Sequence, residues 1–351
     1  MPRKRDLYLN CQATNVLVSI NIKVIPPVLE KSNGCDSLVL QEASILKLGD
    51  KDILLRFHAA SLNYRDLLIG QYPFPVKNSV VPLGDGAGVV QAIGPQVTRF
   101  QVGDSVIPIF HQGHLAGSLD AKSIKTGLGS SLDGTLRPYG AFDEERLVKL
   151  PGNLSFIEDA TLPCAALTAW SALYGLQGKA VAQGDIVLTQ GTGGVSLFAL
   201  QFAKASGAKV IATTSSKEKA DLLKQLGADE VINYKECPRV THIVEVAGPA
   251  TMKESLKAIK IDGVISMVGF VAGSPAADQP SLIDTLFRVC TVRGIGVGSR
   301  LQFEGMNRAI EVNDIHPVVD NRIFKFGEVR EAYQYLSDQK HVGKVCIEIQ
   351  T

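Results

Sequence analysis

The sequence predicts an α/β protein in which a doubly wound parallel sheet is combined with a mainly β region. The first observation is the stretch 185–216, where a short apolar run, a glycine turn, a helical pattern and a second apolar run follow one another, as in a strand–helix–strand unit. The second is the region up to about residue 150, where short apolar runs alternate with glycine and proline. A change of pattern near 151–156 separates the two regions, and the chain turns mixed again after Val297.

Length, charge and cysteine content limit the classes of function. At 351 residues the chain is too long for one ordinary core, so two domains are expected. A net charge of +1 gives no electrostatic case for nucleic acid or a membrane surface, and no apolar run approaches the roughly 20 residues of a membrane span. The basic start at 2–5 continues into polar sequence, and the six cysteines are widely scattered, so we expect a cytoplasmic protein without disulfides. The cysteines are Cys11, Cys35, Cys164, Cys237, Cys290 and Cys346.

The first region is expected to be built from strands and turns. A short helix is expected at 65–69, where Asn63 and Asp66 are residues suited to cap its start. The Gly- and Ser-rich segment 114–138 lacks periodicity and is expected to form a long surface lobe. The apolar runs predict strands at 16–24, 37–40, 52–60, 88–93 and 105–110.

The central region is expected to alternate buried strands and helices. Strands are predicted at 186–189 and 209–213, with a helix that continues from Val195. In the last part of the chain we expect a helix at 326–336 and a closing strand at 344–349.

The glycine turn between the first strand and its helix is a candidate phosphate site. Gly191 and Gly193 match the first two positions of the G-x-G-x-x-G fingerprint of dinucleotide-binding proteins, and Ser196 stands at the third. Glycine lets a pyrophosphate approach the helix N-terminus, where free N–H groups and the helix dipole favour negative charge. A tight turn that holds no ligand is the alternative interpretation.

The end of the second strand indicates which dinucleotide would bind. An acidic residue about 20 positions after the fingerprint normally holds the ribose 2′-hydroxyl, and none is present here. The sequence offers instead the hydroxyls of Thr214 and Ser215 and the charges of Lys217 and Lys219, which suit a 2′-phosphate. This favours NADPH over NADH; the alternative is that the lysines belong to a solvated helix start.

Seven stretches resemble the medium-chain dehydrogenase/reductase family, and within it the branch of quinone-oxidoreductase-like and zinc-type alcohol dehydrogenase-like proteins that works without zinc. The resemblance implies a GroES-like catalytic domain formed by residues 1–156 and 299–351, with a Rossmann NADP-binding domain, 157–298, inserted between them. It also implies an active cleft at their junction for a small-molecule substrate. The stretches are SLNYRD at 61–66, GDGAGVV at 84–90, FQVGDSV at 100–106, ATLPCAALTAW at 160–170, the glycine turn, LGADEVINY at 226–234 and HVGKVCI at 341–347.

The resemblance extends the set of candidate cofactor residues. Lys219 and Tyr234 match positions that touch the adenosine phosphate end in quinone oxidoreductases. Thr168, the run 268–270 and Lys344 match positions near the nicotinamide or the rear wall of the cofactor site. The full set is Thr168, Gly191, Thr192, Gly193, Gly194, Val195, Thr214, Ser215, Lys219, Tyr234, Val268, Gly269, Phe270 and Lys344.

Most positions that hold a catalytic zinc in zinc-using relatives carry other residues here. Asn63 stands in place of the first cysteine, Asp85 and Gly86 stand where a histidine and a glutamate follow a glycine, and only Cys164 remains. One thiolate cannot hold a catalytic zinc, and no cluster of four cysteines offers a structural site. We therefore expect no zinc, with Cys164 a buried small side chain.

A second metal hypothesis rests on the pair His111 and His114, because an H-x-x-H pair can share a helical face. Proline and glycine neighbours make this segment a loop, and no third ligand is apparent in the sequence. A metal at this pair is therefore not the favoured interpretation.

Without a metal, hydrogen-bond donors must polarise the hydride acceptor, and the candidates are Asn63, Tyr64 and Tyr72. Asn63 could instead cap the helix at 65–69, and the tyrosines could be ordinary half-buried core residues. We expect an NADPH-dependent reductase that delivers hydride to a carbonyl, enone or quinone. The alternatives are an NADP-dependent alcohol dehydrogenase and a catalytically weakened family member that acts as a binding module.

Two features of the predicted parallel sheet remain open. Only the residues 235–240 separate the apolar run ending at Tyr234 from the next strand, expected at 241–247, whereas a parallel crossover usually needs a dozen or more. Strand three is therefore displaced or short, or a crossover helix has been deleted from the chain. The apolar run 291–298 supplies the sheet edge through which relatives commonly form homodimers, or is simply the last buried strand.

Overall fold

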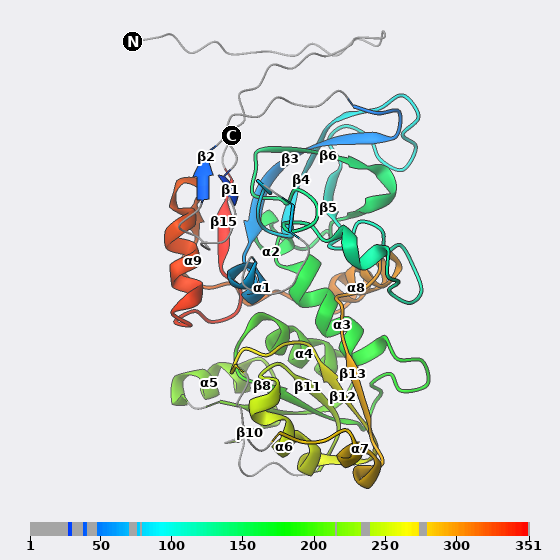
Figure 1. Ribbon diagram of the computed structural model, residues 1–351, viewed down its shortest axis with the longest axis vertical. Helices are drawn as coiled ribbons and strands as arrows, with labels where there is room; N and C mark the ends of the chain where they lie inside the picture. The colour runs from blue at the N-terminus through cyan, green and yellow to red at the C-terminus, as the bar shows by residue number, and fades with distance from the viewer. Residues whose placement is uncertain are drawn as a thin grey trace.

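The computed structural model describes residues 27–29, 38–40, 48–69, 76–77, 79–214, 216–232, 239–273 and 279–349. They form two units stacked along the long axis, each built around its own sheet (Figure 1). This arrangement confirms the predicted fold class, a GroES-like β unit combined with a parallel Rossmann-like sheet. The expected strand at 16–24, Tyr72, Ser215 and Tyr234 lie outside the described residues, as does most of the link after Tyr234.

The first unit, called the catalytic unit after the domain expected above, is built on a seven-stranded sheet in which the two halves of the chain meet. The strand β15 near the carboxyl end pairs antiparallel with β3, so that they lie side by side (Figure 1). Ile53, Leu55 and Phe57 on β3 are fully buried, and burial of such side chains contributes about 1.5–3 kcal/mol each. The strands are β3 (Asp52–Ser61), β4 (Asp85–Ile93), β5 (Ser105–Pro108), β6 (Tyr139–Asp143), β7 (Leu147–Lys149), β14 (Phe324–Lys325) and β15 (Cys346–Glu348); β1 (Pro27–Leu29) and β2 (Leu38–Leu40) pair separately.

Several predicted bounds in this unit differ from the structure. The strand predicted at 88–93 begins at Asp85, and the one predicted at 105–110 ends at Pro108, although the Ile109 N–H still donates to the Arg146 carbonyl at 2.9 Å. The segment 114–138 is a lobe whose only helical turn is the 3₁₀ turn Ser123–Thr126.

Helices cover this sheet and fill the junction with the second unit. The helix predicted at 326–336 begins with the 3₁₀ turn Phe326–Glu328 before it becomes α-helical. A π-helical turn, Leu162–Ala166, continues directly into α3. The helices are α1 (Tyr64–Leu68), α2 (Phe156–Asp159), α3 (Leu167–Tyr174), α8 (Arg300–Val312) and α9 (Val329–Ser337), and a further 3₁₀ turn is Glu144–Arg146.

The second unit is a six-stranded parallel sheet with the order β10-β9-β8-β11-β12-β13. The chain first builds outward from β8 in one direction and then restarts at β11 on its other side, so a crevice for ligands forms where these two strands separate. The strands are β8 (Ile186–Gln190), β9 (Lys209–Thr213), β10 (Glu230–Ile232), β11 (Val240–Glu245), β12 (Ile259–Met267) and β13 (Thr291–Gly294); the helices are α4 (Gly194–Ala205), α5 (Lys217–Gln225), α6 (Pro249–Ala258) and α7 (Ile283–Arg288).

The strand after α5 is short, which is one of the explanations expected for the brief link. β10 has three residues, pairs with β9 at the sheet edge and is followed by β11 on the far side of β8. A chain from Ile232 to Val240 reaches roughly 28 Å, and the strand spacings between β10 and β11 alone take about 14 Å of it. The length of the link therefore has no surplus for a helix of a dozen residues.

Two further observations concern the described residues alone. No helix among them is both long and apolar enough to cross a membrane. Cys164, Cys290 and Cys346 are free thiols.

Candidate active site

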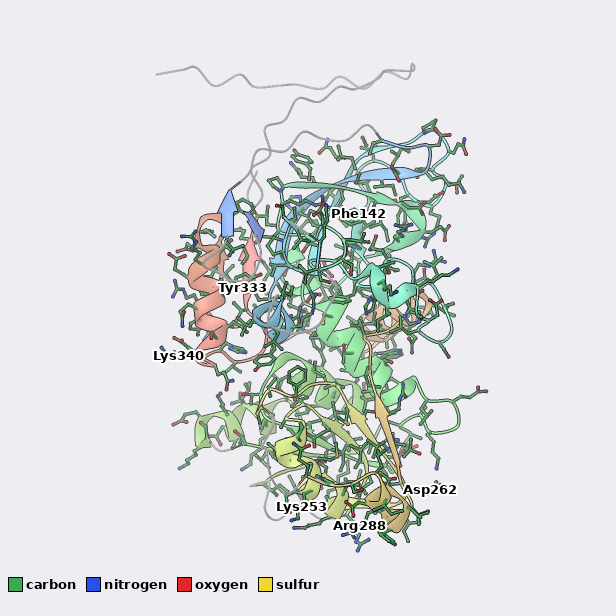
Figure 2. All side chains as sticks on the ribbon, in the orientation of Figure 1. Phe142, Lys253, Asp262, Arg288, Tyr333 and Lys340 are labelled. Atoms are coloured by element: carbon green, nitrogen blue, oxygen red, sulfur yellow. The ribbon has the colours of Figure 1, made fainter. Side chains whose placement is uncertain are left out.

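A cleft of about 310 Å³ lies where the two units meet, at the carboxyl end of β8. The Rossmann unit contributes the glycine turn and the catalytic unit contributes the start of α1 and the segment after α9. Lys340, labelled in Figure 2, marks where that segment leaves α9 near the second unit. The candidate residues that the structure brings together in this cleft are Asn63, Tyr64, Gly191, Thr192, Gly193, Gly194, Val195, Lys219 and Lys344.

The glycine turn is shaped by backbone geometry that side chains would disturb. Gly191 follows β8 with φ +74°, a conformation that costs other residues strain, and Gly193 is the N-cap of α4 with open space where a Cβ would stand. Ser196, the non-glycine position of the fingerprint, donates from Oγ to the carbonyl of Gln190 at 2.6 Å and so closes the turn. The open face at Gly193 and the N-terminus of α4 form a cradle that suits a phosphate.

The catalytic unit is joined directly to this turn. The Gly343 N–H donates to the Thr192 carbonyl at 2.9 Å, and Gly343 forms a β-bridge with Gly193. A methyl group on Gly194 would stand 2.7 Å from Cδ of Lys344, so the stem of that lysine packs against the start of α4. The segment 341–344 is thus fixed relative to the cradle.

A buried ion pair lies behind the cleft at the start of α1. The Lys344 ammonium donates to the Leu62 carbonyl at 2.8 Å, to Asn63 Oδ1 at 2.6 Å and to Asp85 Oδ2 at 3.1 Å. The side chains of Lys344 and Asp85 are 4% and 0% exposed, so the pair is shielded from water. Asp85 Oδ2 also accepts from Ser61 Oγ at 3.1 Å. All three ammonium protons have acceptors, which the burial of a cation requires.

This pair determines how Asn63 is oriented. Its Oδ1 accepts from Lys344, and its Nδ2 donates to Asp85 at 2.8 Å. Because an ammonium can only donate and a carboxylate can only accept, the amide has one orientation. The cap of α1 comes instead from Asp66, whose carboxylate accepts from the Asn63 N–H at 2.8 Å. Asp66 therefore makes the cap hydrogen bond of α1, and the Asn63 side chain is held by the ion pair.

The donor set at this place does not fit a catalytic zinc. Asp85 is engaged by the Lys344 ammonium, and burial together with the Asp85 charge raises the pKa of the Cys164 thiol to about 12. One thiol beside a carboxylate that already binds a cation is too small a ligand set for zinc. Across the described ranges, no three His, Cys, Asp or Glu side chains are grouped so that they could hold a metal.

The histidine pair of the lobe is buried in a loop, as expected from its glycine and proline neighbours. His114 Nε2 lies 3.0 Å from the Gly117 carbonyl, and burial with the neighbouring His114 lowers the pKa of His111 to about 4.

Other candidate residues lie outside the lining of the cleft. Thr168 is buried in α3, Thr214 Oγ1 accepts from the Ser216 N–H at 3.3 Å, and Phe270 packs against Gly248. Val268 and Gly269 precede it after β12, next to Val271, which does line the cleft. The roles expected for these residues stay predictions, as do those of the cleft residues.

Sequence reasoning missed three residues of the site. Gln190 at the end of β8 joins this strand to the end of β11. Its Nε2 donates to Glu245 at 2.8 Å, and its Oε1 accepts from the Val246 N–H at 3.0 Å. Asp85 was considered only as a metal position, although a buried carboxylate needs a cationic partner. His341 lines the cleft and stands in the quoted HVGKVCI stretch, which was the signal available for it.

Comparison with known proteins places these features in a family. The profile described as "Alcohol dehydrogenase GroES-like domain" matches residues 49–152, and the one described as "Zinc-binding dehydrogenase" matches residues 194–311. A zinc-type alcohol dehydrogenase-like protein of Schizosaccharomyces pombe is 43% identical over 340 residues, which cover 92% of this chain and 98% of that protein. The chain belongs to the medium-chain dehydrogenase/reductase family. It is an oxidoreductase of that family, whose members use a nicotinamide cofactor.

Other relatives of this dehydrogenase/reductase chain agree in fold and differ in substrate. A 2-methylene-furan-3-one reductase of Solanum lycopersicum is 30% identical over 311 residues, covering 85% of this chain and 72% of that one. The structure of a candidate alcohol dehydrogenase from Sinorhizobium meliloti superposes with a TM-score of 0.84 at 38% identity, over 94% of this chain and all (100%) of that one. An NAD-dependent alcohol dehydrogenase structure gives 0.82 at 27% identity, over 93% and 100%.

Proposed function

We propose that this chain is a zinc-independent reductase that uses NADPH to reduce a carbonyl, enone or quinone in the cleft between its two units. The observation that carries the proposal is the Asn63 amide, fixed between Lys344 and Asp85 at the edge of that cleft. Its second Nδ2 proton has no described acceptor and can donate to a substrate oxygen. A donor oriented in advance stabilises negative charge that develops on such an oxygen.

The residues of the cradle fit a dinucleotide. Gly191 and Gly193 leave the backbone bare at the N-terminus of α4, and Lys219 lines the same cleft from α5. No carboxylate directly follows β9 to hold a ribose 2′-hydroxyl, the next one being Glu218 in α5, and this supports NADPH. When bound, the nicotinamide would supply the hydride.

The chain's own groups would handle the oxygen and the proton. Asn63 would hold the substrate oxygen, and Tyr64, which lines the cleft at the start of α1, or solvent would return the proton. Tyr72, the second candidate donor, lies outside the described residues.

Zinc independence is supported by what stands at the metal position. The Lys344 ammonium supplies a positive charge beside Asp85 and Asn63, and Cys164 is the one thiol that remains at this position. The match to the zinc-binding dehydrogenase profile spans 194–311 and includes none of these residues.

Two alternatives remain candidates. Alcohol oxidation is favoured by the names of the Schizosaccharomyces and Sinorhizobium proteins, and enone reduction by that of the tomato reductase. The short link after β10 favours a binding module that keeps the fold without turnover.

Cofactor titration with a substrate panel tests the proposal. We expect NADPH to bind at least tenfold more tightly than NADH and to be oxidised with one or more quinones, enones or aldehydes. Binding without turnover, on a panel that includes alcohols with NADP⁺, would favour the module. Equal or tighter binding of NADH would contradict the NADPH assignment.

A further inference from the structure

His341 stands on the catalytic side of the cleft, opposite the Rossmann helix α5. The next residue, Val342, donates its N–H to Asp320 at 2.9 Å, and Gly343 donates to the carbonyl of Thr192 in the glycine turn at 2.9 Å. These two bonds attach the backbone beside His341 to Asp320 in its own unit and to the glycine turn of the Rossmann unit. The imidazole lines the cleft together with the turn and Lys219.

The ring has an unused polar atom in this position. His341 Nδ1 is buried and has no hydrogen-bond partner among the described residues. A buried polar atom without a partner costs free energy, so a native site that keeps one points to a missing ligand or water.

The charges around the ring leave an excess of positive charge toward the cleft. Lys219, Lys344 and Asp320 are the charged groups that act on His341. Lys344 is committed to Leu62, Asn63 and Asp85, and the carboxylate of Asp320 accepts from Arg322 N, Val342 N and Tyr335 Oη. Lys219 has no ion pair with any described residue, and it faces the same cleft.

Protonation of the free ring is unfavourable. Burial and the neighbouring lysines lower the pKa of His341, so its imidazole is neutral near pH 7 when no anion lies beside it. A bound dianionic or monoanionic phosphate would reverse this balance, because an opposite charge within a few ångströms favours the charged ring.

We propose that His341 binds a phosphate group of the dinucleotide as an imidazolium, so that cofactor binding takes up one proton. The inference rests on the proposed function, since it assigns a residue to the cofactor of the same cleft. Lys219 supplies permanent charge from α5, and His341 supplies charge only when the phosphate is present. Affinity then decreases as pH rises, by up to about tenfold per pH unit between the two pKa values.

The test is the dissociation constant of NADPH and of NADH from pH 5.5 to 8.5, by calorimetry in buffers of different ionisation enthalpy. We expect the wild-type constant to rise about tenfold from pH 6 to 8, with proton uptake near pH 7. His341→Asn keeps a polar side chain and is expected to bind more weakly at pH 6 and to lose most of this slope. Lys219→Met is expected to weaken binding at every pH and to keep the slope, and His316→Gln, an exposed histidine that does not line the cleft, is the matched control.

The outcomes separate the two hypotheses. An unchanged slope in His341→Asn, with thermal unfolding showing that the variant is folded, would overturn the inference and leave the proposed function standing. Failure of the wild type to bind either dinucleotide would overturn both. A lost slope for both cofactors identifies the pyrophosphate as the group that His341 binds, and a lost slope for NADPH alone identifies the 2′-phosphate.

Discussion

The side-chain amide of Asn63 lies between a cation and an anion, which fixes its orientation at the edge of the cleft. The Lys344 ammonium at Oδ1 draws electron density from the amide, and the bond to Asp85 leaves one Nδ2 proton for another acceptor. Lys344 lines the cleft and Asp85 lies behind it, and the two together position Asn63.

Asn63→Leu should therefore impair chemistry more than cofactor binding. The substitution keeps the volume and removes the oriented donor, and loss of one such donor costs about 10²–10³ in kcat. Steady-state rates and NADPH titration measure the two effects, with the dissociation constant expected within a factor of two or three. Asn313→Leu at the exposed end of α8 is the control. An unchanged kcat in Asn63→Leu would remove the amide from the mechanism.

Asp159 at the end of α2 is a buried carboxylate without a partner among the described residues. Both of its oxygens are buried and unbonded, and burial raises its pKa to about 8. The folded chain therefore holds this proton at pH values where the unfolded chain has released it.

Stability should fall as pH rises because of this group. The unfolded carboxyl loses its proton near its ordinary pKa of 3.8, whereas the folded one keeps it until about 8, so the penalty grows through this window. We expect Asp159→Asn to unfold at higher urea concentration than the wild type at pH 8, with a smaller difference at pH 5. Glu254→Gln, in an exposed ion pair, is the control. A difference that is equal at both pH values would contradict the assignment.

At the residue scale, sequence reasoning found side chains that belong to a motif and missed those defined by their partners. Gly191, Lys219 and Asn63 stand in recognisable patterns, and all line the cleft. Gln190 depends on contacts between segments far apart in the chain, and no spacing in the sequence encodes those contacts. His341 stands in the HVGKVCI stretch, but that stretch does not show which residues it faces.

The glycine turn is the element on which the cofactor argument depends. The two fingerprint glycines of this turn differ in backbone conformation. Gly191 has a positive φ, whereas Gly193 has ordinary backbone angles and open space beside it. A methyl group at position 193 would thus be tolerated by the protein and would stand where a phosphate approaches.

Gly193→Ala should separate stability from binding. We expect a loss of about 1 kcal/mol or less in unfolding free energy, from the poorer N-cap, and at least a tenfold weaker NADPH complex. Denaturant unfolding and fluorescence titration measure the two quantities. Gly327→Ala, which also has open space at its Cβ and lies in the 3₁₀ turn before α9, should change neither. Wild-type affinity in Gly193→Ala would place the phosphates elsewhere.

At the element scale, continuous patterns predicted strands and helices well, and their ends less well. The strand predicted at 52–60 is β3 with one further residue, because apolar and mostly buried side chains continue along its length. The strand expected to end at Tyr234 is described only as far as Ile232, and the helix predicted at 326–336 starts as a 3₁₀ turn. Such ends depend on local hydrogen bonding that apolar periodicity does not record.

The whole molecule presents an apolar surface at one edge of its parallel sheet. Beside the edge strand β13, helix α7 exposes Leu286 by 66% and Phe287 by 75%, and Leu282 and Val289 next to it are 89% and 56% exposed. Asp262 and Arg288, labelled in Figure 2, mark this end of the molecule. An unpaired strand edge beside large apolar side chains is suited to association with a second copy.

We expect the chain to form a homodimer through this edge and Phe287→Asp to disrupt it. Burying one phenylalanine contributes about 1.5–3 kcal/mol per copy, and a charge there opposes association. Light scattering after size exclusion measures the mass, and Ile124→Asp, which changes an exposed apolar residue of the lobe, is the control. A monomeric wild type, or a dimeric Phe287→Asp, would contradict the expected interface.

At this scale the sequence predicted two units and the pairing of both halves of the chain in one sheet, because the resembling stretches are spread over the whole length. The exposure of α7 could not be read from the pattern. It depends on which surfaces the other elements leave uncovered.

The central claim is NADPH-dependent reduction without zinc, and the most direct measurement is the rate of NADPH oxidation by protein freed of metal with a chelator. The rate is followed with the best substrate of the panel, and residual metal is quantified by mass spectrometry. We predict that kcat stays within a factor of two of the untreated protein and that added zinc does not increase it. Loss of turnover on chelation, with recovery on addition of zinc, would contradict the account.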